Sequence, residues 1–385
     1  MKKLLYILLL FFIGNIFSQE EKPTWKFKDN VVINGYVKYL PSVSFTGIDN
    51  FYTNILIHNR INIKAYVNDN FTAKLSLRNR ITYGELVKLN PNYSKTMDVD
   101  NGELDLSFLL VDQEAFIIHS IIDRAYVDYA KGKWQIRLGR QRINWGINLA
   151  WNTNDLFNAY NIVDFDYEEK AGADAVRVQY FIKNSNLDFA YKLGKDMDNS
   201  VVALMYKFNK YKYDFQVLAA NYNTDLAIGA GWAGNLKKAG FKGESTLFID
   251  KNNSDKVFST STSVDYYFQK GLYLNGTFLY TSNGETSFNP SVLNFIGSTL
   301  SAKKLMPTKY SYLLQASKEF NPRFKSSITT IYGAGMDLLF VMPSVDYSIK
   351  QNWDLNLTGQ LFYAKTVEKF DNLNNSIYLR LQYSF

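Results

Sequence analysis

The chain ends in Ile377–Phe385, IYLRLQYSF, and this stretch decides the fold. Its odd-numbered positions are apolar, and its even-numbered positions are mostly polar. A period of two residues indicates a β-strand with one apolar face and one polar face. In an exported chain, a last strand of this kind that closes on an aromatic residue indicates a β-barrel of an outer membrane.

The opposite end of the chain has the pattern of a secretory signal peptide. Lys2 and Lys3 form a positive start, Leu4–Ile13 is an apolar stretch, and Ser18 is a small residue at the expected cleavage point. Such a leader is removed on export. Beyond it, no apolar run is long enough to cross a bilayer as a helix. We therefore expect an exported chain that meets the membrane through strands.

The composition suits a chain with one face in lipid and the other in water. Tyr and Phe number 28 each, and aromatic residues make up 16% of the chain, yet the mean hydropathy is slightly negative. The chain has no cysteines and only two histidines, which excludes disulfides and thiolate sites, so we expect no cofactor and no metal centre. The formal net charge is +7, but export argues against nucleic acid as a partner.

Alternating segments recur along the whole chain. Asn54–Val67, Asn186–Leu193 and Trp353–Tyr363 each place apolar residues on one face and mostly polar residues on the other. Two kinds of break alternate between such segments. The short breaks lie at 68–70, 131–133, 184–186, 209–210, 235–239, 269–271, 321–323 and 350–352. The longer breaks lie at 47–50, 85–119, 146–172, 194–200, 221–224, 251–255, 282–307, 333–337 and 366–374. Short turns at one rim and longer loops at the other are typical of outer-membrane barrels.

These patterns predict an all-β fold, a transmembrane antiparallel β-barrel of about 18 strands. We expect a signal peptide over residues 1–18, a short periplasmic segment over 19–30 and the barrel over 31–385. Aromatic residues close to the short turns support this orientation, because they would form a girdle at the membrane interface. These residues are Phe71, Trp134, Tyr211, Phe324 and Trp353. A soluble sandwich also has alternating strands, but more prolines and shorter strands would be expected of it.

If the apolar face of each strand meets lipid, a set of cations is left inside the barrel. This predicted basic wall comprises Arg60, Lys64, Lys74, Arg78, Arg80, Arg124, Arg137, Arg140, Arg142 and Arg177. A positive wall in a narrow pore raises the local concentration of anions. We therefore expect a porin-like channel for the passive passage of small anionic solutes. The alternative is that these arginines pair with loop carboxylates and only satisfy the barrel interior.

The long connection 146–172 is predicted to fold into the lumen and to narrow it. The residues assigned to this constriction are Trp151, Asn154, Asp155, Asp164, Asp166, Glu168 and Glu169. Their carboxylates would face the basic wall, and long loops are often functional. A solvated surface loop, or one that binds a cation through its oxygens, is the alternative.

The alternation breaks in the segment that precedes this loop. Unbroken parity from Trp134 would turn Arg140 and Arg142 toward lipid, where arginine is costly. A β-bulge near Gly139 would turn both arginines inward and would place Ile143 and Trp145 on the outer face. We therefore predict a bulge at this glycine, which unbroken pairing through it would refute.

Residues 134–182 resemble a known family. GRQ at 139–141, WG at 145–146 and DAVR at 174–177 are similar to motifs of the alginate-export family and related porin-like barrels. The resemblance implies a barrel of similar strand number with an inward loop between the motifs. It also implies an arginine-rich lumen for anionic solutes that includes Arg140, Arg142 and Arg177. Residues 152–158 and 164–169 depart from the family pattern, so no substrate is carried over.

Two other functions compete with the channel. A structural or assembly barrel of a secretion or surface-polymer export system would be blocked by its own loops. A hydrolase at the outer rim would use His119, beside Ser120 and near Asp123, although the chain lacks a Gly-x-Ser-x-Gly elbow.

The glycines of GAGWAG at 229–234 match a dinucleotide spacing, but no helix follows them, so we interpret them as places where the barrel backbone bends.

The expected partners follow from the barrel. They are outer-membrane lipid, a small anionic solute and, through the strand that ends in Phe385, the barrel-assembly machinery. No feature of the sequence sets the oligomeric state.

Overall fold

The computed structural model describes residues 25–46, 50–100, 102–158, 166, 170–287, 300–365 and 369–385, so the predicted leader lies outside the described residues. The strands are β1 (Val31–Thr46), β2 (Asn50–Tyr66), β3 (Phe71–Gly84), β4 (Ser107–Gln113), β5 (Phe116–Lys131), β6 (Trp134–Gln141), β7 (Ala173–Ile182), β8 (Ser185–Lys192), β9 (Val201–Lys210), β10 (Tyr213–Tyr222), β11 (Asp225–Leu236), β12 (Ala239–Asp250), β13 (Lys256–Phe268), β14 (Leu272–Thr281), β15 (Tyr310–Asn321), β16 (Phe324–Ala334), β17 (Leu338–Lys350), β18 (Trp353–Lys365) and β19 (Phe370–Ser384). The short helices are α2 (Phe27–Asn30), α3 (Glu85–Leu89), α4 (Tyr93–Met97) and the 3₁₀ turn η1 (Met197–Asn199). None of these helices has the length and apolar character that a bilayer crossing requires.

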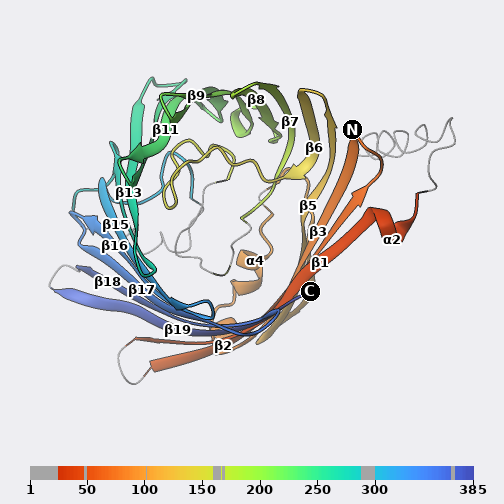
Figure 1. Cartoon of the computed structure of the whole chain (residues 1–385). Helices are drawn as coiled ribbons and strands as arrows, with labels where there is room; N and C mark the ends of the chain where they lie inside the picture. The colour runs from red at the N-terminus through yellow and green to blue at the C-terminus, as the bar shows by residue number, and fades with distance from the viewer. Residues whose placement is uncertain are drawn as a thin grey trace.

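The strands form one closed antiparallel sheet (Figure 1). Nearly all strands pair with their neighbours in the chain, and β1 pairs with β19 from Tyr36 opposite Ser384 to Phe45 opposite Asn375. Closure leaves no exposed sheet edge, which matters in lipid because each unsatisfied backbone group there costs several kcal/mol. The predicted all-β antiparallel barrel is confirmed.

Strand β4 explains why 19 strands make a barrel of 18. Strands β3 and β5 pair directly along their length, so β4 is not inserted between them. Instead, β4 pairs with the other edge of β5, from Ser107 opposite Ile121 to Gln113 opposite Phe116. Strand β6 uses the same edge of β5 only between Ala125 and Lys131. The short β4 therefore extends the wall beyond the end of β6, and the other 18 strands close the barrel.

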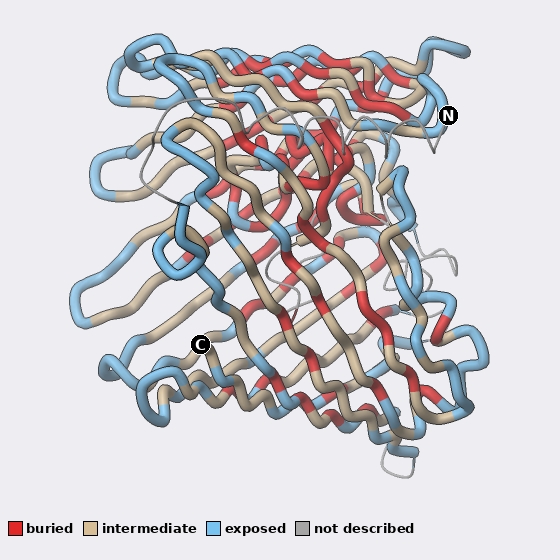
Figure 2. The backbone as a smooth tube through the Cα atoms, turned by 90° about the vertical axis from the view of Figure 1, so that its right-hand side faces the viewer, coloured by how far each residue is buried: buried red, intermediate tan, exposed pale blue. Residues whose placement is uncertain are grey.

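Side chains alternate between the lumen and the outer face. On β13, Ser259, Ser261 and Ser263 are buried inside, whereas Phe258 and Val264 are exposed on the outer face. Buried positions recur at intervals along the strands of the wall (Figure 2). This pattern is what a wall with an apolar outside and a polar inside requires.

The short connections, the start of β1 and the end of β19 share one rim, which we call the short-turn rim. Val31, the first residue of β1, pairs with Ala65, close to the turn at 67–70. Aromatic pairs follow this rim: the ring centroids are 4.7 Å apart for Phe71 and Tyr129, and 4.5 Å apart for Trp134 and Tyr180. The turns lie within two residues of the short breaks predicted from the sequence.

The seam between the first and last strands ends in a close approach of Gly35 and Phe385. The backbone N–H of Gly35 donates to the carbonyl of Phe385, and the N–H of Phe385 donates to the carbonyl of Gly35, each at 3.0 Å. A Cβ atom at Gly35 would collide with the carbonyl of Arg60 and would lie 2.9 Å from the Phe385 ring.

We predict that Gly35→Val destabilises the closed barrel. The added side chain forces the seam apart, at an expected cost of about 1–3 kcal/mol. The temperature at which the folded band of an unheated electrophoresis sample disappears should fall by several degrees. Gly276→Val is the matched control, because a Cβ at Gly276 meets only Leu314, at 3.6 Å. Equal melting of both variants would contradict the prediction.

Candidate functional site in the barrel lumen

Residues 142–158, here the inner loop, follow β6 and lie inside the barrel (Figure 1). Ile143, Trp145 and Phe157 are buried in one apolar cluster with inward-facing residues of the wall. The wall makes room for these side chains with alanines on neighbouring strands. These are Ala190 on β8, Ala203 on β9, Ala220 on β10 and Ala227 on β11. The prediction that Ile143 and Trp145 lie on the outer face is therefore wrong.

One buried carboxylate anchors the backbone of the inner loop. Glu244 on β12 accepts hydrogen bonds from the N–H groups of Ile147 and Asn148, each at 3.1 Å, and from that of Asn154 at 2.9 Å. Thr246, two residues along the same strand, donates to the carbonyl of Thr153 at 2.7 Å. A buried backbone N–H group that loses its acceptor costs about 1–3 kcal/mol, so these hydrogen bonds let the strand hold the loop firmly.

The side chain of Asn154 lies against the glycines of the GAGWAG stretch. Its Nδ2 donates to the carbonyl of Ala230 at 3.1 Å, and a Cβ at Gly229 would lie 2.6 Å from its Oδ1. A Cβ at Gly231 would lie 2.7 Å from Ile147. The pairing of β11 with both neighbours runs through these glycines without a register shift. Gly229 and Gly231 thus make room for the inner loop, whereas a Cβ at Gly234 would collide with the Tyr213 ring. The interpretation that these glycines mark bends of the backbone stays a prediction.

A second apolar cluster holds the inner loop against the wall between β14 and β16. Ala150 and Trp151 are buried with Leu279, Leu305 and Ile331, which come from β14, the following loop and β16. The inner loop thus covers the inner surface of the wall from β8 to β16. Trp151, Asn154 and Asp155, three of the residues assigned to the constriction, all lie in this buried layer.

The predicted bulge at Gly139 is wrong. Strand β6 pairs with β5 and with β7 without a register shift through this residue. The backbone turns instead through the conformation of the glycine itself, whose φ of 117° is unfavourable for residues with a Cβ. The strand then ends at Gln141, so Arg142 is already part of the inner loop.

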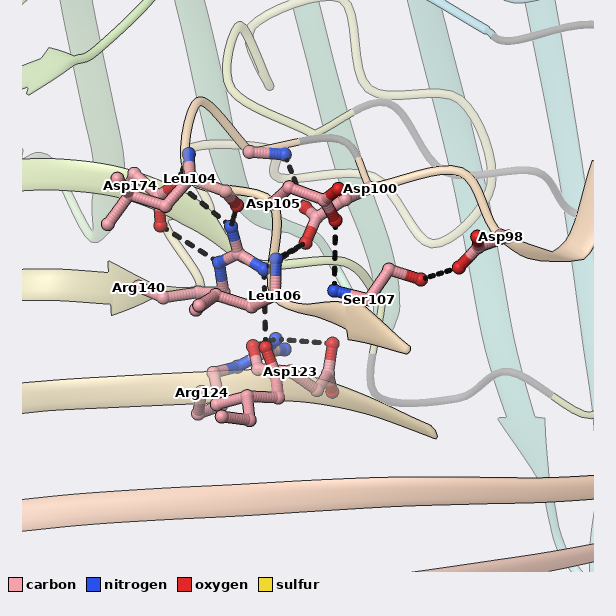
Figure 3. Close-up of polar contacts among 12 residues, drawn as sticks. Asp98, Asp100, Leu104, Asp105, Leu106, Ser107, Asp123, Arg124, Arg140 and Asp174 are labelled. Carbon is pink, nitrogen blue, oxygen red and sulfur yellow. Dashed lines mark hydrogen bonds and ion pairs between the residues drawn. The ribbon is translucent and has the colours of Figure 1, made fainter. Parts of the chain in front are cut away.

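Arg140 serves as a structural clamp (Figure 3). It forms a bidentate pair with Asp174, with N–O distances of 2.8 and 2.9 Å, and donates to Asp100 at 2.6 Å. It also donates to the carbonyls of Leu104 and Ile122, so all five of its N–H groups point at protein acceptors. Arg140 is only 3% exposed. Its contacts fix the segment before β4 to the ends of β6 and β7.

Most other arginines of the predicted wall are also paired with carboxylates. Arg60 lies 2.5 Å from Asp123, which also contacts Arg124 at 3.1 Å. Three more pairs follow: Arg137 with Asp128 at 2.9 Å, Arg142 with Asp155 at 2.7 Å, and Arg177 with Asp188 at 2.5 Å. The alternative in which carboxylates satisfy the arginines therefore holds for much of the wall, although the partners lie on strands as well as on loops.

The other cations of the wall lie on β2 and β3. Arg78 and Arg80 line one side of a cavity of about 60 Å³ that Asp100, Asp123 and Arg140 also border. Lys64 is exposed to the lumen near the short-turn rim, and Lys74 is half-buried opposite it in the register. Among the described residues, no carboxylate lies within ion-pair distance of Lys64 or Lys74.

The surroundings of His119 do not suit a hydrolase. Arg80 donates to His119 Nδ1 at 3.0 Å, and a guanidinium can only donate, so the proton of the neutral ring sits on Nε2. That nitrogen lies 2.6 Å from Ser107 Oγ, which in turn donates to Asp98 at 2.6 Å. A general base would need Nε2 free to accept the serine proton. Ser120, the predicted neighbour, faces away and donates to Asn79.

Asp166 contacts cations that are not part of the predicted basic wall. Its carboxylate accepts from Lys38 at 3.2 Å and from His58 Nδ1 at 3.0 Å, and it lies 3.7 Å from Arg380. Burial alone would raise the pKa of Asp166, but the hydrogen bond from His58 and the charge of Lys38 hold it below its ordinary value. The other predicted constriction residues, Asp164, Glu168 and Glu169, lie outside the described residues.

Sequence reasoning missed Glu244 and Lys38. Glu244 holds the inner loop, and Lys38 holds Asp166, further along the same connection between β6 and β7. The sequence did contain a signal for Glu244. It is an acidic residue in the middle of a strand, and the neighbouring strands place only a glycine and a serine opposite it. Lys38 is almost fully buried, and its strand gives no sign of a partner 128 residues away.

We predict that Glu244→Gln loosens the inner loop. An amide can accept on only one side, so at least one of the three backbone N–H groups loses its acceptor, at a cost of about 1–3 kcal/mol. Hydrogen exchange at Ile147, Asn148 and Asn154 should become about tenfold faster or more. Glu319→Gln, an exposed glutamate near the short-turn rim, is the control. Unchanged exchange in Glu244→Gln would show that the carboxylate does not anchor the loop.

We also predict that the inner loop is held less firmly as the pH rises from 4 to 6. Burial raises the pKa of Asp155 to about 6, even though Arg142 beside it lowers that pKa. Between its ordinary pKa and about 6, the docked loop keeps a proton that the released loop gives up, so the free energy of release falls with pH, by on the order of 2–3 kcal/mol.

The measurement is the protection of the amides of residues 151–156, corrected for intrinsic exchange, at pH 4 and pH 7. In Asp155→Asn, protection should depend less on pH than in the natural chain. The same dependence in both proteins would assign it to another group.

Comparison with known proteins shows a shared fold. No family model matches the chain, and no curated protein matches its sequence. The crystal structure of OprD from Pseudomonas aeruginosa superposes with a TM-score of 0.60 at 8% identity, over 93% of this chain and 95% of that chain. OccK11 (OpdR) of the same organism gives 0.56 at 9% identity, over 93% and 97%. OccAB1 of Acinetobacter baumannii gives 0.56 at 10% identity, over 92% and 96%. The barrel is therefore similar to OprD and Occ structures, and the resemblance to the alginate-export family stays a prediction.

Proposed function

We propose that this chain is an outer-membrane channel through which small anionic solutes diffuse passively. Three features support the proposal: a leader for export in the sequence, a closed barrel with an apolar outside and a polar inside, and a fold shared with OprD and the Occ proteins. Only a closed barrel lets a sheet cross lipid with every backbone group satisfied.

The observation that carries the anion preference is an excess of cations on one side of the lumen. Arg60, Lys64, Lys74, Arg124 and Arg137, here the cationic cluster, come from four neighbouring strands, and each of the other four affects the electrostatic environment of Lys74. Among the described residues, the carboxylates that pair with this cluster are Asp123 and Asp128. In this part of the chain, five positive charges stand against two negative ones, and such an excess raises the concentration of anions in a narrow pore.

The inner loop sets the width of the path in this proposal. It covers the wall from β8 to β16, and Asp166, further along the same connection, contacts β1, β2 and β19. A solute would then pass between this connection and the cationic cluster. Arg142 holds the inner loop through Asp155, and Arg140 holds the segment before β4, whereas Lys64 and Lys74 are the cations that meet the solute.

We predict that Lys64→Gln combined with Lys74→Gln weakens anion preference. An ammonium about 5–8 Å from a passing ion in a water-filled pore contributes about 0.5–1 kcal/mol, so the anion-to-cation permeability ratio should fall about two- to fivefold for each lysine. The measurement is the reversal potential in a planar bilayer under a KCl gradient.

Lys325→Gln is the matched control, because it removes a lysine from β16, across the barrel from the cationic cluster (Figure 1). Cation preference in the natural protein would overturn the proposal. A purified protein without conductance would favour the alternative of an assembly barrel blocked by its loops.

A further inference from the structure

The outer face of the barrel carries a groove that the channel does not use. It has a volume of about 420 Å³ and crosses four neighbouring strands, β13 to β16. Its floor is formed by Gly276 on β14 and Ala316 on β15, and its sides by Tyr266, Leu274, Leu314 and Ile328. A volume of this size lies in the range of sites that hold small organic ligands.

The groove exists because two small residues, Gly276 and Ala316, are diagonal neighbours on an otherwise bulky surface. Gly276 pairs with Leu314, and Leu274 pairs with Ala316, so each small residue stands beside a leucine. Leu314 is 67% exposed, more than its apolar neighbours on the outer face, and therefore forms a wall rather than a lid. Nothing fills the space over Gly276, since a Cβ there would touch only Leu314.

Cations lie at the end of the groove that points to the short-turn rim. Lys318 stands two residues beyond Ala316 on the same face of β15, and its ammonium donates to the carbonyl of Lys270 in the turn between β13 and β14. Arg323 lies in the next turn along this rim. Phe268, Phe320 and Phe324 lie at the ends of strands beside the same turns, and the ring centroids of Phe320 and Phe324 are 5.2 Å apart. Aromatic residues are typical of the level of lipid headgroups.

We propose that the groove holds a phospholipid, with one acyl chain along Gly276 and Ala316 and its phosphate beside Lys318 and Lys270. An apolar slot that ends in ammonium groups at an aromatic rim fits an acyl chain joined to an anionic headgroup. On this reading the bound lipid belongs to the leaflet at the short-turn rim, and its site is independent of the lumen and of solute passage.

The test is native mass spectrometry of the detergent-purified chain with added dioleoylphosphatidylglycerol. The natural protein should keep one lipid molecule after the detergent is removed in the gas phase. Gly276→Leu fills the groove and should lower the lipid-bound fraction about fivefold or more. Ala73→Leu adds the same side chain to a small residue on the outer face of β3, away from the groove, and should keep the lipid.

The headgroup is tested separately. Lys318→Gln combined with Lys270→Gln should lower retention of dioleoylphosphatidylglycerol but not that of zwitterionic dioleoylphosphatidylcholine. Lys212→Gln, in another short turn, should change neither. Full retention of lipid by Gly276→Leu would overturn the proposal. A change from oligomer to monomer in Gly276→Leu with unchanged lipid would identify the groove as an interface between copies instead. Bilayer conductance of Gly276→Leu should equal that of the natural protein.

Discussion

The whole structure depends on the pairing of β1 with β19, because a sheet that crosses lipid can have no free edge. The seam brings residues 36–45 against residues 375–384, and Gly35 and Phe385 complete it with two backbone hydrogen bonds. This constraint fixes an even number of strands when the first strand begins and the last strand ends at the same rim. It also fixes the alternation of side chains, since each strand must show lipid an apolar face.

Closure creates a second constraint, which concerns the charges inside. Several charged side chains inside the barrel are buried, and a buried charge needs a partner. Arg60 meets Asp123, Arg177 meets Asp188, and Arg140 directs all five of its N–H groups at the protein. Most of the arginines therefore stabilise the barrel and its loops. In the proposed channel, Lys64 and Lys74, nearer the short-turn rim, are the cations that meet the solute.

The architecture could be predicted from the sequence because it depends on local patterns. A period of two marks the strands, and dipeptides such as Lys131-Gly132 mark the turns, so strand number and rim assignment follow without any long-range information. The pairing of Arg137 with Asp128 is also within reach, since these residues stand opposite each other in the register of β5 and β6. The pairing of Arg60 with Asp123 is not, because β3 lies between their strands.

The errors around Gly139 have one physical cause, which is that lipid was assumed to be the only apolar environment. Ile143 and Trp145 are apolar, so parity assigned them to the outer face, yet they are buried inside the barrel. The signal that could have corrected this lies on other strands. Small residues recur at inward positions from β8 to β11, including Ala190, Ala203 and Gly229, where polar side chains would be expected in a water-filled lumen. A patch of small inward residues implies that something apolar packs against it, and the nearest long apolar connection is the inner loop itself.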